Sequence, residues 1–365
     1  MSHDVQITAA GKTVTVKDGD TILDAAMMAG ISYPHSCRAG RCGACKSRLV
    51  EGEVELLPHT RFSLTDEERD AGLVLACRAM PLSDCTISWL RDDEALATAH
   101  PVRKVNCTVV ELDDLTHDIK QVRLRVENGE PFSFTAGQYA QVTFPGCPSR
   151  EYSMANHPDE SVLEFHVRHV PGGTTSAHVA HELAVGDTVE VEGPFGTSYL
   201  RERHAGPIVA VAGGSGLAPV KSILEAALAA GMRQPIHLYF GARDERDVYL
   251  EPHLQSLIER HDNLQTHIVL SEPNGPTERK TGLVTEVMAA NWDKVTGCRA
   301  YLAGPPPMVE AATELLLAQG VPVDNIHADA FYTSADREPA VSAPEEQVTQ
   351  GETEKACSCC QSASS

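Results

Sequence analysis

Positive charge is scarce in this chain, and long apolar runs are absent. The 30 Lys and Arg residues stand against 51 Asp and Glu, which gives a formal net charge of −21 at pH 7. Such a surface repels phosphate, so we exclude nucleic acid as a partner. No stretch reaches about 18 apolar residues, so we expect neither a membrane-spanning helix nor a membrane partner. The acidic surplus favours solubility, and docking to a partner's basic patch is the alternative.

A secretory signal is also missing. Residues Met1 to Gln6 include neither a basic segment nor an apolar one, so we expect a cytoplasmic protein. In that setting the 11 cysteines favour metal binding over disulfides. The sequence contains no internal repeat, and its length of 365 residues predicts two or three domains.

Four cysteines have the spacing of a plant-type ferredoxin. Cys37, Cys42 and Cys45 form the pattern C-x₄-C-x₂-C, and Cys77 follows downstream. Four thiolates at this spacing hold a [2Fe–2S] cluster, which transfers one electron at a time. Four scattered cysteines are expected to be small buried residues instead: Cys85, Cys107, Cys147 and Cys298.

Residues 1–91 read as a small α+β unit with a β-grasp fold. Apolar residues alternate on both sides of Gly11, which predicts a hairpin. A helix is predicted over residues 21–29 with Asp20 as its N-cap, and the capping-box spacing at residues 65–68 predicts a second one. Strands are predicted at 46–56, 73–78 and 86–90.

A linker at residues 92–102 leads to a unit rich in short strands, residues 103–205. Its only helical period lies near residues 176–183, so we predict an antiparallel β-barrel. The strands are predicted at 107–112, 119–126, 139–144, 163–170 and 188–193.

Residues 206–334 alternate between strands and helices, as an α/β Rossmann-like domain does. The run at 208–212 is wholly apolar, as expected of a parallel strand buried on both faces. Further strands are predicted at 236–240, 265–270 and 300–303, and helices at 219–230 and 252–260.

The last segment, residues 335–365, lacks aromatic residues and is predicted to be a disordered acidic tail. Its thiols, Cys357, Cys359 and Cys360, read as incidental, with a metal site as the alternative.

Two short motifs in the barrel segment suit a flavin dinucleotide. In R-x-Y-S, Arg150 offers a bidentate clamp for a phosphate, Tyr152 a packing surface and Ser153 a hydroxyl for a ring nitrogen. The run Gly172–Ser176 opens a helix, where backbone N–H groups bind a pyrophosphate. Each motif alone also fits an ordinary strand end or turn.

Two glycine-rich turns in the α/β segment suit a nicotinamide dinucleotide. The first, Gly213–Pro219, follows the apolar strand without matching G-x-G-x-x-G, so an ordinary tight turn is the alternative. The second contains Gly304 and Pro305 and also follows a strand. At adjacent strand ends the two turns would line one crevice.

In this order, the motifs resemble the NADH-dependent reductase components of multicomponent bacterial oxygenases. The resemblance covers residues 3–333 and implies a ferredoxin domain fused to a ferredoxin–NADP reductase-like module. It departs from many relatives at Ala303, where they have a cysteine before the Gly-Pro turn. Residues 328–332 resemble the family's C-terminal acidic-x-aromatic motif, which implies that Phe331 lies near the flavin face.

The resemblance implies a role for each matching residue. Ser153 and Phe331 take the catalytic positions. The flavin site comprises Arg150, Tyr152, Ser153, His166, Arg168, Gly173, Thr175, Ser176 and Phe331. The nicotinamide nucleotide site comprises Gly213, Gly214, Gly216, Pro219, Gly304 and Pro305.

Electron counting then predicts the activity. NADH supplies two electrons at once and the cluster accepts one, so FAD is expected between them. The chain is therefore expected to be an NADH-dependent oxidoreductase, a monomer that reduces an aromatic-compound oxygenase component or its ferredoxin. NADPH is the alternative coenzyme, because Arg243 could pair with its 2′-phosphate. Other acceptors, such as a separate ferredoxin or a sugar dehydratase, and a redox- or NADH-sensing role are the alternatives.

Overall fold

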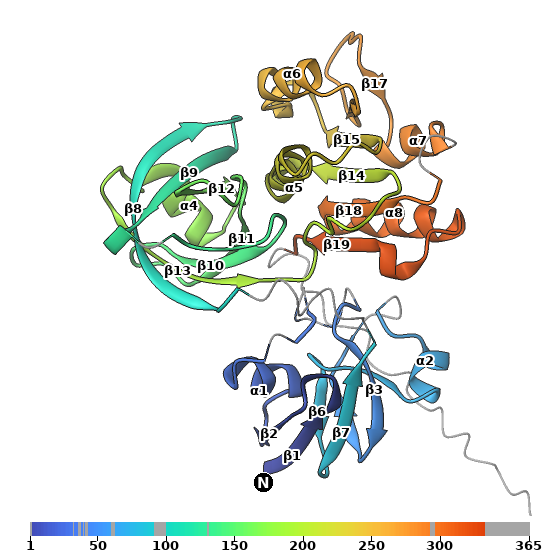
Figure 1. Ribbon diagram of the computed structural model, residues 1–365. Coiled ribbons are helices and arrows are strands. Elements are labelled where there is room, and N and C mark those ends of the chain that lie inside the picture. The colour runs from blue at the N-terminus through green and yellow to red at the C-terminus, as the bar shows by residue number, and fades with distance from the viewer. Residues whose placement is uncertain are drawn as a thin grey trace, which may run out of the picture.

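The protein, described here from a computed structural model, contains three sheet-based units that follow one another along the chain (Figure 1). The structure describes residues 2–31, 33–35, 38, 40, 43–59, 63–90, 100–129, 131–292 and 296–332. Cys37, Cys42, most of the predicted linker and the predicted tail therefore lie outside the described residues. In the described part of the chain, no helix is long and apolar enough to cross a membrane.

The first unit packs a mixed sheet against one helix, α1 (Ile22–Met28). The predicted hairpin around Gly11 is confirmed, and Val5 lies opposite Val14. Thr21 caps α1 by accepting a hydrogen bond from Asp24 N–H, so the prediction of Asp20 as N-cap was wrong by one residue. The strand order is β2 (Lys12–Lys17), β1 (Ser2–Ile7), β7 (Cys85–Trp89), β3 (Lys46–Glu51) and β5 (Leu73–Leu75), with a separate pair β4 (Val54–Leu56) and β6 (Ala79–Pro81).

The second short helix of this unit, α2 (Asp66–Asp70), begins at the predicted capping box. Thr65 accepts a hydrogen bond from Glu68 N–H, and the Glu68 carboxylate accepts one from Thr65 N–H. The N-terminus lies at the end of this unit that faces away from the other two (Figure 1).

The second unit is the predicted antiparallel barrel. An isolated bridge between Met154 and Phe165 joins the two edges of the sheet and closes it. The helix α4 (Thr174–His181) follows the glycine pair and packs on the strand that precedes it. The strand order is β11 (Arg150–Ser153), β10 (Tyr139–Thr143), β13 (Thr188–Phe195), β8 (Arg103–Asp114), β9 (Ile119–Val126) and β12 (Val162–Arg168).

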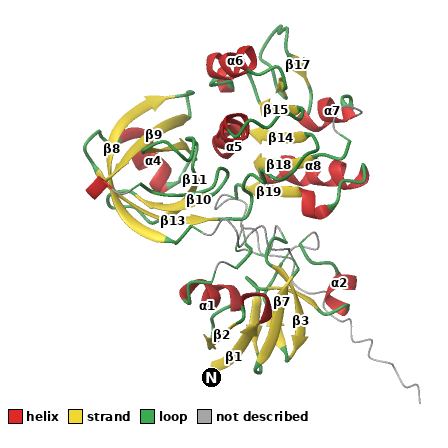
Figure 2. Ribbon diagram, in the orientation of Figure 1, coloured by secondary structure: helices red, strands yellow, loops and turns green. Residues whose placement is uncertain are grey.

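The third unit is a parallel sheet with helices on both faces (Figure 2). The strand order is β17 (Lys280–Thr281), β16 (Leu264–Leu270), β15 (Ile236–Ala242), β14 (Ile208–Gly213), β18 (Arg299–Gly304) and β19 (Ile326–Ala330). One face carries α5 (Leu217–Ala229) and α6 (Glu251–Arg260), and the other α7 (Val284–Ala289) and α8 (Pro306–Ala318).

Strand β14 is the first strand of the third unit and lies in the middle of its sheet. All six of its residues are buried, as its apolar composition predicted. The chain runs from β14 outward to β15 on one side and later returns to β18 on the other. The strand order therefore reverses at β14, and open α/β sheets bind their ligands at such a point.

Candidate electron-transfer site

Two of the predicted cluster ligands converge in the first unit. The sulfurs of Cys45 and Cys77 lie 3.2 Å apart, both are buried, and neither takes part in a disulfide. The two segments are joined by a hydrogen bond from Ala76 N–H to the Cys45 carbonyl. Two buried sulfurs from separate segments, brought this close, fit the ligation of one iron.

The other described cysteines do not join this pair. The Cys85 sulfur lies beside the carbonyls of Glu53 and Ser83, at 3.4 and 3.2 Å. Cys107 and Cys298 are fully buried, as predicted, and burial raises the pKa of each thiol to about 12. Cys147 is only half-buried, so that prediction was wrong.

The first unit, residues 2–90, is called the ferredoxin-like unit from here on, and it meets the barrel next to the predicted cluster loop. The buried hydroxyl of Thr197 donates to the His35 carbonyl at 3.1 Å. Arg38 bridges the two units, with its guanidinium 3.3 Å from Asp24 on α1 and 4.0 Å from Glu151 on β11. These contacts place residues on both sides of Cys37 against the barrel, with Arg38 facing the R-x-Y-S strand.

The R-x-Y-S motif forms β11 at the edge of the barrel. Arg150 is exposed, and Tyr152 packs edge-on against Phe144 at 6.1 Å between ring centroids. Ser153 is buried and donates to Asp329 on β19 at 3.2 Å. The motif therefore reaches from the barrel surface to the third unit. Asp329 was not among the predicted site residues, although it belongs to the acidic-x-aromatic segment.

The glycine pair opens α4, with Gly173 at its N-cap and Gly172 at a left-handed φ of 77°. The nearby hydroxyls already stabilise the loop. Thr175 donates to the Pro148 carbonyl at 3.1 Å, and Ser176 accepts from Val170 N–H at 3.1 Å. This leaves the backbone N–H groups of the first turn of α4 as the donors available for a pyrophosphate.

His166 and Arg168 on β12 turn their side chains toward the third unit. The His166 ring is buried between Glu164 and Tyr249, of which Tyr249 belongs to the third unit. Arg168 donates to Asp118 of the barrel at 2.9 Å, and its guanidinium lies 3.0 Å from the position that a Cβ on Gly214 would occupy. The side chains of His166 and Arg168 are thus engaged with other protein groups. Their contact with the flavin stays a prediction, based on the resemblance of this strand to the family's flavin-binding strand.

The two glycine turns of the third unit touch one another. A Cβ on Gly304 would lie 2.7 Å from the Gly213 carbonyl oxygen, and one on Gly216 would lie 2.1 Å from that of Ala303. Glycine is required here because the backbones of the two turns are in direct contact. The turns thus line one edge of the sheet, at the carboxyl ends of β14 and β18.

The C-terminal motif meets the second turn. Phe331 N–H donates to the Gly304 carbonyl at 2.9 Å, and its half-buried ring packs against the core beneath α5. A small cavity is lined in part by Pro219, Ala303 and Asp329, the last of which belongs to the C-terminal motif. Ser153, the Gly-Pro turn and the C-terminal motif therefore surround one point between the barrel and the sheet.

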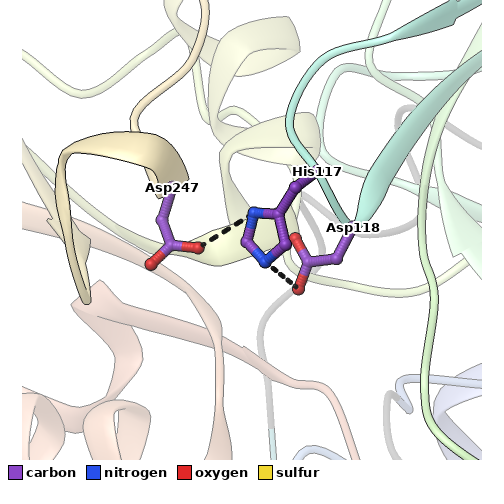
Figure 3. Close-up of side chains that lie close together, drawn as sticks. All are labelled: His117, Asp118 and Asp247. Atoms are coloured by element: carbon purple, nitrogen blue, oxygen red, sulfur yellow. Dashed lines mark ion pairs between the residues drawn. The ribbon is translucent and has the colours of Figure 1, made fainter.

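A cluster of charged groups bridges the barrel and the third unit at the C-terminal end of β12, next to Arg168. His117 lies between Asp118 and Asp247, at 4.0 and 3.7 Å (Figure 3). Such a triad is a metal-binding pattern, but Arg168 and Arg243 approach the same carboxylates within 2.9 and 3.7 Å. Burial is the largest single influence and opposes ionisation of Asp118, but the Arg168 charge and the hydrogen bonds from Thr116 and Arg168 together hold the pKa of Asp118 below its usual range. Two guanidinium groups repel a cation, so this is an ion-pair network.

Paired buried thiols, a flavin-type barrel and a parallel sheet with facing glycine turns define an iron–sulfur flavoprotein oxidoreductase. Comparison with known families agrees. The family models described as "2Fe-2S iron-sulfur cluster binding domain", "Oxidoreductase FAD-binding domain" and "Oxidoreductase NAD-binding domain" match residues 5–82, 106–199 and 210–314.

Relatives cover nearly the whole chain. The ferredoxin–NAD(P)⁺ reductase component of the naphthalene 1,2-dioxygenase/salicylate 5-hydroxylase systems of Ralstonia sp is 44% identical over 88% of this chain and 96% of its own. That of the Pseudomonas putida naphthalene 1,2-dioxygenase system is 40% identical, over 86% and 94%. Among solved structures, the Amycolatopsis cytochrome P450 reductase GcoB is similar, with a TM-score of 0.75 and 35% sequence identity. The match covers 90% of this chain and 98% of that one. The chain belongs to the family of ferredoxin–NAD(P)⁺ reductase components of oxygenase systems.

Proposed function

We propose that the chain takes electrons from NADH and passes them to an oxygenase component or to that oxygenase's ferredoxin. The single observation that carries this proposal is the meeting of three units at one place. Ser153 of the barrel binds Asp329 of the sheet, and Glu151 on the same strand faces Arg38 of the ferredoxin-like unit. When bound, FAD would accept a hydride and the cluster would carry single electrons, which links a two-electron donor to a one-electron acceptor.

The residues of the chain supply positions and donors for this chemistry. Arg150 and the first turn of α4 would bind the phosphates of FAD, and Cys37, Cys42, Cys45 and Cys77 would hold the cluster. Ser153 would place its hydroxyl at the flavin ring, oriented by the Asp329 carboxylate. Phe331 would cover the flavin until the nicotinamide takes its place.

We infer NADH rather than NADPH from the surroundings of Arg243. Its guanidinium lies 3.7 Å from Asp118 and 3.7 Å from Asp247. These two carboxylates already neutralise it and would repel a 2′-phosphate beside it. A steady-state comparison of the two coenzymes checks this, and equal kcat/KM values would contradict it.

An anaerobic titration with NADH tests the proposed function. Both the flavin and cluster absorbance should bleach, and cluster bleaching should disappear in protein stripped of FAD. A cluster that stays oxidised for minutes in the presence of NADH would overturn the proposal.

The acceptor distinguishes a reductase from a sensor. Addition of an oxidised oxygenase or ferredoxin should reoxidise the cluster over many turnovers, and a monomeric cytoplasmic protein is expected to do this as a diffusing partner. A single reduction that no acceptor protein reverses would favour the redox- or NADH-sensing alternative.

A further inference from the structure

Three alternate residues of β12 face the third unit from one side of the strand. Glu164 lies 3.5 Å from the ammonium group of Lys221 on α5. The Arg168 guanidinium donates to Asp118 of the barrel and lies 3.0 Å from the position that a Cβ on Gly214 would occupy. Between them, His166 contacts Tyr249, which precedes α6. Side chains two residues apart share a face of a strand, so β12 contributes a continuous polar seam to this domain interface.

His166 and Tyr249 connect this seam to the first glycine turn. His166 Nε2 lies 2.9 Å from the Glu164 carboxylate, and His166 Nδ1 lies 3.2 Å from the Tyr249 hydroxyl oxygen. The same hydroxyl lies 3.2 Å from the Gly214 carbonyl oxygen. Each of these three side chains is at least nine-tenths buried, so water does not substitute for a missing partner.

The three contacts need three protons between them. Glu164 is ionised, because the His166 hydrogen bond and the Lys221 charge outweigh burial and bring its pKa to about 2. Its carboxylate therefore accepts a hydrogen bond from Nε2–H of His166. With neutral His166, Nδ1 carries no proton and accepts a hydrogen bond from the Tyr249 hydroxyl, so this hydroxyl no longer donates to the Gly214 carbonyl. With protonated His166, both ring nitrogens donate and the Tyr249 hydroxyl donates to Gly214.

We propose that Tyr249 is a positioning residue for the nicotinamide dinucleotide, because it holds the first glycine turn at Gly214. The protonation state of His166 controls whether Tyr249 makes this contact. This inference rests on the proposed function, since it concerns the turn assigned to that coenzyme. Gly214 is in a left-handed conformation, with φ of 54°, and its carbonyl shares one planar peptide with the N–H of Ser215. The two point in opposite directions, so fixing the carbonyl at Tyr249 fixes the N–H that the turn offers to a phosphate.

The pH dependence follows from the state of His166. Burial is the largest influence and lowers the pKa of His166, against the opposing effect of Glu164. The second proton therefore binds only on acidification below the usual histidine range, and dinucleotide binding should tighten there. The charged and titratable groups around the pair are Asp118, Arg123, Arg168, Lys221, Glu225 and His253.

Calorimetric binding of NAD⁺ to the FAD- and cluster-containing protein tests the proposal between about pH 4.5 and about pH 8, a range that extends below the ordinary histidine pKa. At the acid end, Tyr249→Phe should weaken binding about three- to tenfold, the effect of one hydrogen bond. At the alkaline end, the two proteins should differ by less than about twofold. His166→Asn should remove the pH dependence while the nearby His253 is still present.

Tyr239→Phe is the matched control. Its hydroxyl is buried on β15 of the third unit and has no hydrogen-bond partner in the described part of the chain. It should bind NAD⁺ as wild type does at every pH. Equal affinity of Tyr249→Phe and wild type throughout, or a penalty that does not change with pH, would overturn the proposal. A wild-type protein that neither binds NAD⁺ nor is reduced by NADH would show instead that the proposed function is wrong.

Discussion

At the residue scale, the direction in which a cysteine sulfur points identifies a cluster ligand better than the burial of its thiol does. Cys77 and Cys85 are equally inaccessible, at 3% and 4% exposure, but only Cys77 points its sulfur at another predicted ligand. Cys77→Ser should therefore abolish the visible cluster absorbance, and Cys85→Ser should retain it, as measured in freshly purified protein. Both variants should keep NADH–ferricyanide activity, because the flavin alone reduces a small oxidant. Cluster loss in Cys85→Ser but not in Cys77→Ser would mean that the fourth ligand is misassigned.

The Ser153 hydroxyl offers a second prediction at this scale. Ser153→Ala removes a donor held by Asp329, so it should slow flavin reduction by NADH at least about tenfold while FAD content stays at the wild-type level. Stopped-flow flavin bleaching measures the rate, and the cofactor released by denaturation measures the content. An unchanged rate would remove Ser153 from the catalytic residues.

The sequence predicted residues that have a local motif and missed those defined by distant contacts. Ser153 was found through R-x-Y-S, whereas its partner Asp329 lies 176 positions away. Tyr249 has no motif around it, and only the folded interface shows that it reaches Gly214. Glu164 and Lys221 were missed for the same reason, because charged residues in a strand and a helix normally read as exposed.

At the scale of elements, the turn between β14 and α5 is fixed by contact with the end of β18. Gly216→Ala would place a Cβ 2.1 Å from the Ala303 carbonyl oxygen, at a φ of −60° that alanine itself adopts freely. The clash alone should destabilise the protein, by about 1–3 kcal/mol. Thermal unfolding measures the effect.

The control for this substitution lies in the same sheet. Gly241 is paired with Gly213, and a Cβ there would meet Val284 at an ordinary 3.5 Å. Gly241→Ala should therefore unfold close to the wild-type temperature. If the two variants proved equally stable, the tight packing of the turns would be refuted.

Element types were predicted well for the strands with a strong apolar pattern, but the 13-residue helix α8 was missed, as were two strands with a weak pattern. The buried strand β14 and the barrel strands were found through their apolar patterns. The strand β17 has only two residues, which is too short to show a pattern. The strand β19 reads Ile-His-Ala-Asp-Ala, and its pairing with β18 rather than its composition makes it a strand.

At the scale of the whole molecule, the ferredoxin-like unit touches the barrel through a few polar contacts. Glu151→Gln removes the charge that faces Arg38, so transfer to the cluster should slow about two- to fivefold, which is modest because the pair is partly exposed. Cluster bleaching after mixing with NADH measures this, and flavin bleaching should be unchanged.

Glu190→Gln is the control for the loss of a carboxylate on the barrel. Glu190 pairs with Lys104 at 2.8 Å within the barrel itself. The Glu190→Gln variant should therefore show the wild-type rate of cluster bleaching. Equal slowing in both variants would show a general charge effect and would contradict a specific docking role for Glu151.

The seam along β12 also decides how this protein can be recombined with its relatives. In the contacts of Glu164 with Lys221 and of His166 with Tyr249, the barrel supplies one partner and the third unit the other, so exchanging one unit alone would leave a buried carboxylate or ammonium group without its counterpart. The ferredoxin-like unit makes its described contacts through a carbonyl and a partly exposed ion pair, which are easily matched by another sequence. A viable chimaera should therefore inherit residues 100–332 from one parent, with the crossover placed before residue 100.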